Sequence, residues 1–361
     1  MNYLRNEYPR PQFERENWIN LNGVWNFCFD DEDKGLQQRW YLSNQPFDRK
    51  INVPFVYESE LSGINCQDRH DIIWYKREFE LPELSPQENL ILHFGAVDYQ
   101  AKVFLNGQLV KEHTGGETPF SVNITPFLKE ETSQSLCLRV YDPLENQEIP
   151  RGKQFWESCS KGIWYTRSSG IWQTVWMEVV EHQHIESLGM KPDVDKGSVE
   201  LSIGLKNQNK NNWIDLRIYY RDLLVTETRT RCIENRLKIT VDIVQSDIFK
   251  TGFHGPEEYI WSPEYPNLFS VELTLIDSDS QRERDFIKSY FGMRKIHSEN
   301  GIIYLNNKPY YQKLILDQGY WPKSLLTAPS YADYRQDSTL AKQMGLNGCR
   351  KHQKLEDPRF L

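Results

Sequence analysis

The chain has 361 residues, enough for two or three domains, and a formal net charge of −8 at pH 7. This acidic balance provides no basic face for a nucleic acid, and no apolar run approaches the roughly 18 residues of a membrane-spanning helix. Aromatic residues make up 13% of the chain, which favours β-structure. Residues 1–18 contain no apolar core, so we expect no signal peptide and a cytoplasmic protein.

Cysteine and histidine are scattered along the chain. The six cysteines include no Cys-x-x-Cys pair. An even count is compatible with disulfides, but a large chain without a secretion signal favours free thiols. His182 and His184 would share one face of a strand, yet no third metal ligand follows nearby. We therefore expect neither a metal site nor a cofactor.

Residues 1–182 have the pattern of an all-β domain. Residues 21–29 follow a turn and then alternate, and residues 72–81 alternate as a half-buried strand does. Asn106-Gly107 lies between two alternating runs, which is the strongest short-range signal for a β-hairpin. Many short strands with turns between them, and no competing long helix, predict a jelly-roll sandwich.

Residues 183–290 are predicted to form a second β-domain. Four runs alternate apolar and polar residues at regular spacing: 199–205, 215–220, 237–241 and 270–275. About a hundred residues with this pattern fit a small immunoglobulin-like sandwich.

Residues 291–361 begin with a hairpin and continue into a strand–helix–strand unit. The apolar run Leu314–Leu316 is interpreted as a buried strand, and residues 346–350 as a second strand. Between them, Ser330 with an acid three residues later predicts the start of a helix, and Gly345 predicts its end. A lone parallel pair with one helix neither closes a sheet nor covers both its faces. We therefore expect the chain to end inside a domain that it does not complete.

Five motifs follow one another along the chain. They are Leu-Asn-Gly-Val-Trp at 21–25, Trp-Tyr-Lys-Arg-Glu-Phe at 74–79, the run from Phe94 to Gly107, Ser-Gly-Ile-Trp-Gln-Thr-Val at 169–175 and Trp-Ser-Pro-Glu-Tyr-Pro-Asn-Leu at 261–268. In this order and spacing the whole chain resembles the N-terminal part of glycoside hydrolase family 2, which holds β-galactosidases, β-glucuronidases and β-mannosidases. Each motif is weak alone, whereas five in order are specific.

The resemblance implies a mainly β fold with three parts. These are a jelly-roll domain (1–182), an immunoglobulin-like β-sandwich (183–290) and the first strand–helix–strand of an incomplete (β/α)8 barrel (291–361). It also implies an exo-acting, retaining glycosidase, in which one glutamate protonates the leaving oxygen and another attacks the anomeric carbon. Both glutamates come from later barrel strands in the family, and none here stands in either motif. We expect no catalytic residue before Leu361, and no activity from this fragment alone.

Arg350, His352 and Gln353 are candidates for contact with a sugar, because the chemistry of such barrels lies at the carboxyl ends of their strands. The family often has R-x-x-H-Y-P here, and counting back from Pro358 puts Gln353, not His352, in the position of its histidine. A shift of one residue along a strand reverses the direction of a side chain. His352 either lines the site or is hydrogen-bonded in the barrel wall, and Arg350 is expected to form a structural ion pair.

Asp317, Gln318 and Trp321 follow the first strand of the unit on the same face. The two polar residues either hydrogen-bond a sugar hydroxyl or cap the loop, and Trp321 with Tyr320 forms either a stacking platform or a wall. Trp164 stands six residues before the glycine of the Ser-Gly-Ile-Trp motif, where some family members have an aspartate. It either stacks on a sugar or packs between domains, and the departure counts against a galactosidase or glucuronidase assignment.

The expected partner of the full-length enzyme is a β-glycoside, with no nucleic-acid or membrane partner; a homo-oligomer is possible. The alternative function is a stand-alone carbohydrate-binding or scaffold module, because jelly-roll folds also occur in lectin-like domains and a fold does not fix a function. An unfinished barrel argues against that alternative, since its uncovered faces would favour aggregation.

Overall fold

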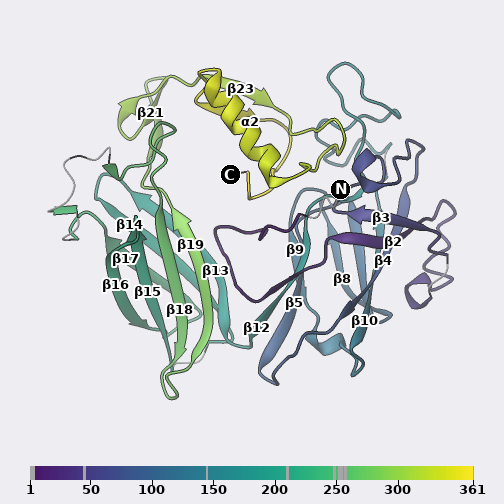
Figure 1. Ribbon diagram of the computed structural model, residues 1–361, viewed down its shortest axis with the longest axis horizontal. Coiled ribbons are helices and arrows are strands. Elements are labelled where there is room, and N and C mark those ends of the chain that lie inside the picture. Colours follow the sequence, from purple (N-terminus) through teal and green to yellow (C-terminus); the bar gives the residue numbers. More distant parts are fainter. Residues whose placement is uncertain are drawn as a thin grey trace.

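The computed structural model describes residues 5–43, 46–143, 145–208, 211–246, 249–250, 255 and 258–360. Residues 1–4, which belong to the segment tested above for a signal peptide, lie outside this range. Figure 1 shows two β-rich bodies side by side, with the C-terminal helix and strands above the space between them. Strands make up 46% of the chain and helices 7%, so the prediction of a mainly β fold is confirmed.

In the described residues, the N-terminal body is built from two main antiparallel sheets. Their strand orders are β3-β2-β4-β10-β7-β8 and β1-β12-β5-β9, and a short pair, β6 with β11, lies beside them. The strands are β1 (Trp18–Asn20), β2 (Gly23–Phe29), β3 (Arg49–Val53), β4 (Ile72–Glu80), β5 (Glu88–Phe94), β6 (Val97–Asp98), β7 (Gln100–Leu105), β8 (Gln108–Thr114), β9 (Phe120–Asn123), β10 (Ser133–Tyr141), β11 (Gly170–Ile171) and β12 (Val175–Glu181). Three single-turn 3-10 helices cover Trp40–Leu42, Glu60–Ser62 and Thr125–Phe127.

The core of this body lies between the sheets. Trp25, Phe27 and Tyr75 are buried there, with the rings of Phe27 and Tyr75 in an edge-on contact at 5.1 Å. Alternate residues of each strand point inward, so burying these side chains holds the two sheets face to face. The predicted Asn-Gly hairpin is confirmed: it joins β7 to β8, and Asn106 and Gly107 have φ angles of 52° and 85°.

The second body consists, within the described ranges, of a three-stranded sheet, β13-β14-β17, and a four-stranded sheet, β16-β15-β18-β19. Its strands are β13 (His184–Asp193), β14 (Ser198–Lys206), β15 (Asn212–Tyr220), β16 (Leu223–Arg231), β17 (Arg236–Asp242), β18 (Phe269–Asp277) and β19 (Glu283–Phe291). The alternation predicted for residues 199–205 is confirmed in β14, where Val199, Leu201, Ile203 and Leu205 are buried.

Arg15 connects the two bodies through the N-terminal arm, which is residues 5–17, before β1. Its guanidinium lies 3.0 Å from a carboxylate oxygen of Glu178 on β12 and 2.8 Å from one of Asp285 on β19. Burial opposes ionisation of Glu178, but the contact with Nε2 of His93 at 3.2 Å and the charges of Arg10 and Arg15 outweigh it and hold its pKa below the usual range. A charged, paired Glu178 therefore fixes the arm between the two bodies.

The third part starts with β20 (Ile296–Glu299), β21 (Ile302–Leu305) and β22 (Lys308–Pro309), followed by β23 (Leu314–Asp317), α2 (Tyr331–Gln343) and β24 (Gly348–Lys351). β23 and β24 are paired in parallel, with Asp317 opposite Lys351. The predicted helix ends are confirmed: Ser330 accepts a hydrogen bond from the backbone of Asp333, and Gly345 follows the helix with φ 79°.

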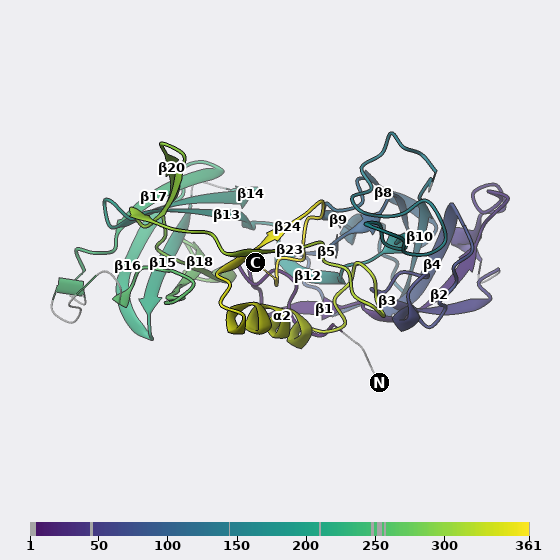
Figure 2. The ribbon, with the colours of Figure 1, turned by 90° about the horizontal axis from the view of Figure 1, so that it is seen from above.

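The prediction that Leu314–Leu316 is buried was wrong. The three residues form a strand, yet they are 39%, 41% and 54% exposed. A parallel pair needs cover on both faces, whereas Figure 1 shows β23 at the upper edge of the described chain and Figure 2 shows α2 on one side of β23 and β24. The apolar strand therefore lacks the neighbours that its composition calls for.

Candidate functional site

A loop of the N-terminal body, residues 145–169, reaches the carboxyl ends of β23 and β24. The ring of Tyr165 in this loop stacks on Tyr320, with centroids 4.1 Å apart and planes at 8°. Gly152 lies so close to the segment after β24 that a Cβ atom on it would stand 2.4 Å from the carbonyl oxygen of Gln353. The strand ends and this loop therefore line one site.

Asp317, the last residue of β23, forms an ion pair and a hydrogen bond. One carboxylate oxygen lies 2.6 Å from Nζ of Lys351, and the other accepts a hydrogen bond from the backbone of Gly319 at 2.7 Å. Lys351 also lies 2.8 Å from the buried carboxylate of Glu356. Burial disfavours the charge of Lys351, but these two carboxylates prevail and raise its pKa. Of the two roles considered for Asp317, the geometry favours the loop cap.

His352 and Gln318 are brought together by the parallel pair. Nε2 of Gln318 lies 3.3 Å from Nδ1 of His352, and the backbone of His352 donates to the carbonyl of Asp317. Burial, and then the charges of Arg350 and Lys153, lower the pKa of His352. Gln353 instead is exposed with φ 54°. The motif count pointed to Gln353, whereas the contact with Gln318 belongs to His352.

Arg350, Trp321 and Trp164 are the remaining residues that the sequence predicted to contact a sugar. The predicted ion pair of Arg350 was wrong, because its side chain is exposed and no carboxylate of a described residue is within ion-pair distance. Trp321 packs edge-on against Tyr334 of α2 at 5.8 Å, in the position of a wall. Trp164 lies in the loop, 5.5 Å from the ring of Trp156.

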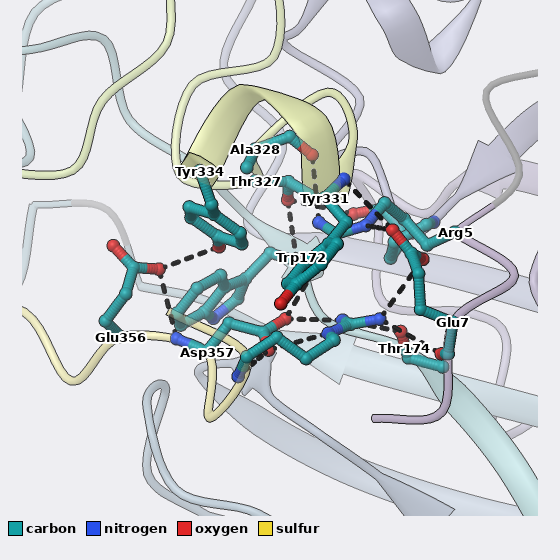
Figure 3. Close-up of polar contacts among 12 residues, drawn as sticks. Arg5, Glu7, Trp172, Thr174, Thr327, Ala328, Tyr331, Tyr334, Glu356 and Asp357 are labelled. Carbon is teal, nitrogen blue, oxygen red and sulfur yellow. Dashed lines mark hydrogen bonds and ion pairs between the residues drawn. The ribbon is translucent and has the colours of Figure 1, made fainter. Parts of the chain in front are cut away.

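A polar network fixes the third part on the N-terminal body (Figure 3). Thr327 donates to the carbonyl of Trp172 at 2.6 Å, and Arg5 of the N-terminal arm donates to the carbonyl of Ala328. Arg359, paired with Asp357, donates to the hydroxyl of Thr174 across the same interface. These contacts hold the strand ends at a fixed position relative to the loop.

Lys354 is a buried cation in this interface. Its Nζ donates to the carbonyls of Gly319 and Leu326, each at 2.7 Å, lies 3.0 Å from Glu356 and stands 5.2 Å from the ring of Trp172. Burial outweighs the attraction of Glu356 and lowers the pKa of Lys354. Trp172 belongs to the Ser-Gly-Ile-Trp motif, so that motif packs directly under the segment that follows β24.

Three carboxylates under the loop were missed by the sequence analysis. Glu58 is buried and accepts from the backbone of Ser169 at 3.2 Å, and Asp142 accepts from the hydroxyl of Ser169 at 2.6 Å. Asp98 accepts from Gln154 at 2.6 Å. Burial raises the pKa of Glu58 to about 8 and that of Asp142 to about 6. Nothing local in the sequence marks these residues, because they meet only through the fold.

Two further observations concern other parts of the chain. A hollow of about 550 Å³ lies between the N-terminal arm and β19, away from the carboxyl ends of β23 and β24. Two of its polar residues already have partners: Lys288 forms an ion pair with Glu16, and Glu272 accepts a hydrogen bond from Tyr219. Among the described residues, no group of three or more His, Cys, Asp and Glu side chains is arranged to hold a metal ion. No helix in the described ranges has the length and apolarity to cross a membrane.

Two family models match the chain. Residues 19–175 match the glycosyl hydrolases family 2 sugar binding domain, and residues 183–294 match glycosyl hydrolases family 2. The chain belongs to glycosyl hydrolase family 2. The resemblance inferred from the five motifs is thereby confirmed.

Curated relatives of this family 2 chain include enzymes of two kinds. A β-galactosidase of Thermoanaerobacter pseudethanolicus is 24% identical over 91% of this chain and 41% of its own length. A β-glucuronidase of Streptococcus agalactiae is 24% identical over 82% of this chain and 47% of its own length. The chain thus spans less than half the length of these relatives.

Solved structures share the fold of this family 2 chain. A β-glucuronidase from an uncultured Clostridium sp. superimposes with a TM-score of 0.77 at 22% identity, over 98% of this chain and 57% of that one. A β-glucuronidase from Ruminococcus gnavus, in complex with D-glucuronic acid, gives a TM-score of 0.73 at 18% identity, over 95% of this chain and 57% of that one.

Proposed function

We propose that this chain is the front part of an exo-acting, retaining β-glycoside hydrolase of the β-galactosidase, β-glucuronidase and β-mannosidase group. The observation that carries the proposal is the parallel unit β23–α2–β24, whose carboxyl ends face a loop of the N-terminal body. In a (β/α)8 barrel, active sites lie at that end of the strands. The exposed Leu314–Leu316 is then the first strand of a barrel whose later strands would cover it.

The same proposal divides the chain into three domains: a jelly roll over 1–182, an immunoglobulin-like sandwich over 183–290 and the start of the barrel over 291–361. Two separate buried cores support the first division, one centred on residues such as Trp25 and Tyr75, the other on residues such as Leu216 and Leu273. The parallel pairing of β23 with β24 supports the second, since the other sheets of the described residues are antiparallel.

Retaining hydrolysis needs two carboxyl groups about 5.5 Å apart on opposite sides of the bond. Two carboxylates at the strand ends, Asp317 and Glu356, are both paired with Lys351. Neither is placed to protonate a leaving group or to attack a sugar. We propose that both catalytic glutamates belong to later strands of the full-length enzyme, and that this fragment supplies only contacts to the substrate.

Among these contacts, His352 and Gln318 are the best-placed pair. Their side chains touch each other at the strand ends and stay partly exposed, so each keeps hydrogen-bonding capacity for a sugar hydroxyl. We assign Gln353 and Arg350 to the rim of the site, and Trp164 to the wall formed by the loop. Trp321, which packs on Tyr334, would support the helix and not the sugar.

Hydrolysis of 4-nitrophenyl β-galactoside, β-glucuronide and β-mannoside tests the proposal. We expect no turnover by this chain, and turnover with retention of anomeric configuration once the chain is extended by the roughly 250 residues of a barrel. Hydrolysis by the 361-residue chain would overturn the assignment of the catalytic pair to later strands. A stably folded, inactive extended chain that still binds sugars would favour a binding module instead.

A further inference from the structure

Cys66, His70 and Asp31 form a line of three side chains in the N-terminal body. Sγ of Cys66 lies 3.9 Å from Nε2 of His70, and Nδ1 of the same ring lies 2.7 Å from a carboxylate oxygen of Asp31. Cys66 and His70 belong to the segment before β4, whereas Asp31 lies in the turn after β2. A thiol, an imidazole and a carboxylate in this order are the parts of an activated nucleophile.

The ring of His70 is held in one orientation. It stacks on Phe29, with centroids 3.6 Å apart and planes at 15°, and the ring of Tyr57 stands 5.8 Å away on β-sandwich core residues. A carboxylate only accepts hydrogen bonds, so Nδ1 carries the proton in the contact with Asp31. Nε2 of the neutral ring is then an acceptor that faces Sγ. The proton of the Cys66 thiol therefore has a base within reach.

The charged groups around His70 leave Asp31 to act on the ring. Within the described ranges, the carboxylate of Asp31 has no other ion-pair or hydrogen-bond partner. The cations nearby are paired elsewhere: Arg69 lies 2.9 Å from a carboxylate oxygen of Asp71, and Arg49, which stands over the ring of Phe29, is 3.7 Å from Asp48. A carboxylate on Nδ1 stabilises the imidazolium that forms when Nε2 takes up a proton.

Cys66 differs from the other cysteines of the chain. All six are free thiols, and three of them are buried. Cys159 is exposed and Cys349 half-buried, but neither contacts an imidazole of a described residue. Cys66 combines partial exposure with a base beside its sulfur. A thiolate, and not a thiol, is the nucleophile in sulfur chemistry, so this cysteine is the one that the fold equips to react.

We propose that Cys66 is a modification site, at which the thiol reacts with a low-molecular-weight disulfide to form a mixed disulfide. His70 takes the proton from Sγ, and the thiolate forms a bond with one sulfur of the reagent. The disulfide bond of the reagent breaks, and its second sulfur leaves with the proton from His70. Cys66 is oxidised and the leaving sulfur is reduced to a thiol, so no further reactant is needed. The inference goes beyond the proposed function and does not depend on it.

Reaction of the 361-residue chain with glutathione disulfide at pH 6.5 tests the proposal, with peptide mass spectrometry giving the rate at each cysteine. About 1% of an ordinary thiol is ionised at this pH. A stabilised thiolate is more abundant but less nucleophilic, which removes much of the gain. We therefore expect Cys66 to react about fivefold faster than Cys159, although Cys159 is more exposed. In 8 M urea, at about the same pH, the two rates should be equal, because the fold that aligns the three groups is lost.

Variants identify the base and its partner. His70→Gln should lower the rate at Cys66 about fivefold and make it rise about tenfold per pH unit below pH 8, as an ordinary thiol does. The unchanged chain should show a shallower pH profile. Asp31→Asn should give a smaller loss. Asp68→Asn is the matched control, because Asp68 lies two residues from Cys66, is exposed and changes the net charge equally. Circular dichroism establishes that each variant is folded.

A Cys66 that reacts no faster than Cys159 in the folded chain, or a difference that persists in urea, would overturn the proposal. So would an unchanged rate and pH profile in His70→Gln, or equal losses in Asp31→Asn and Asp68→Asn. The assay contains no glycoside, so failure of the extended chain to hydrolyse one would leave this site standing.

Discussion

At the scale of single residues, Glu58 combines complete burial with a role in holding the loop. Its side chain accepts a hydrogen bond from the backbone of Ser169, and the guanidinium of Arg167 approaches only to 4.0 Å. Because no close cation compensates for the lost water, burial dominates and the pKa rises to about 8. Asp142 shares Ser169 and has its pKa raised to about 6. The loop therefore rests on carboxyl groups that favour the protonated form.

These pKa values predict that Glu58 and Asp142 contribute less to stability as the pH rises. The carboxyl group of a glutamate ionises near pH 4.3 in the unfolded chain, whereas Glu58 in the folded chain keeps its proton up to a pKa of about 8. Between these two pH values the folded state binds more protons than the unfolded state, so the contribution of Glu58 to stability falls as the pH rises. One such group lowers the free energy of unfolding by at most about 1.4 kcal/mol per pH unit. Urea unfolding at pH 5 and pH 8 measures the difference.

Glu58→Gln should reduce this pH dependence, because glutamine cannot ionise but can still accept the hydrogen bond from Ser169. Glu60→Gln is the control: Glu60 lies two residues further along, is exposed and faces Lys323 at 3.4 Å, so its replacement should leave the slope unchanged. An unaltered slope in Glu58→Gln would contradict the account of the buried carboxyl group.

Single positions at the strand ends were only partly predictable from the sequence. His352 and Gln353 were both candidates, and a one-residue difference in register decides which side chain turns toward Gln318. Arg350 and Lys153 have no ion-pair partner among the described residues, and this depends on which acids other segments of the fold bring near them. Sequence patterns carry no information on that, because the acids come from distant segments and can be bound elsewhere, as Glu356 is by Lys351 and Lys354.

At the scale of elements, features that neighbouring residues determine were predicted correctly, whereas features that depend on long-range packing were not. The Asn106-Gly107 hairpin and the Ser330 and Gly345 ends of α2 were predicted because a few neighbouring residues determine them. The burial of Leu314–Leu316 was predicted wrongly, since burial depends on what covers a strand and not on its own composition. The loop over residues 145–169 showed no periodic pattern, and its position follows from contacts such as that between Gly152 and Gln353.

Gly152 offers a direct test of how this loop docks. It has φ +59°, and a Cβ would stand 2.4 Å from the carbonyl oxygen of Gln353. Gly152→Ala therefore combines a left-handed backbone conformation with a steric clash. We expect a loss of about 2–3 kcal/mol in the free energy of unfolding, and faster hydrogen exchange over residues 145–169.

Gly162→Ala provides the matched control on the same loop. Gly162 has φ +62°, but no atom would lie within 4 Å of its Cβ. This variant should lose only the conformational part, about 1 kcal/mol. Equal losses in the two variants, with unchanged exchange in the loop, would contradict the close docking of Gly152 on the segment after β24.

At the scale of the whole molecule, the three parts form one connected body. Arg15 joins the two sandwiches through Glu178 and Asp285, and Arg5, Thr327 and Arg359 join the third part to the first. The order of the parts could be predicted from five motifs because each lies within one segment. The contacts between the parts could not be predicted from the sequence, because residues such as Glu178 and Asp285 are more than a hundred positions apart and are brought together through Arg15.

The exposed strand of the third part predicts that this chain self-associates. β23 presents Leu314, Ile315 and Leu316 at 39%, 41% and 54% exposure, and an apolar strand at the margin of a sheet is a template for pairing with another copy. Sedimentation velocity should show a concentration-dependent shift to larger species. Leu316→Lys should suppress it, because a charge on an exposed strand opposes pairing, while the free energy of unfolding should change by less than about 0.5 kcal/mol.

Leu223→Lys on β16 separates this surface effect from a general effect of charge. Leu223 is 52% exposed, nearly as much as Leu316, but it lies on an edge strand of the second body, away from the parallel pair. Its replacement should leave association unchanged. Extending the chain by further strand–helix units should suppress association as Leu316→Lys does, because the added elements would cover β23 within the same molecule. Association that persists in Leu316→Lys, or that Leu223→Lys removes equally, would show that the uncovered strand is not its cause.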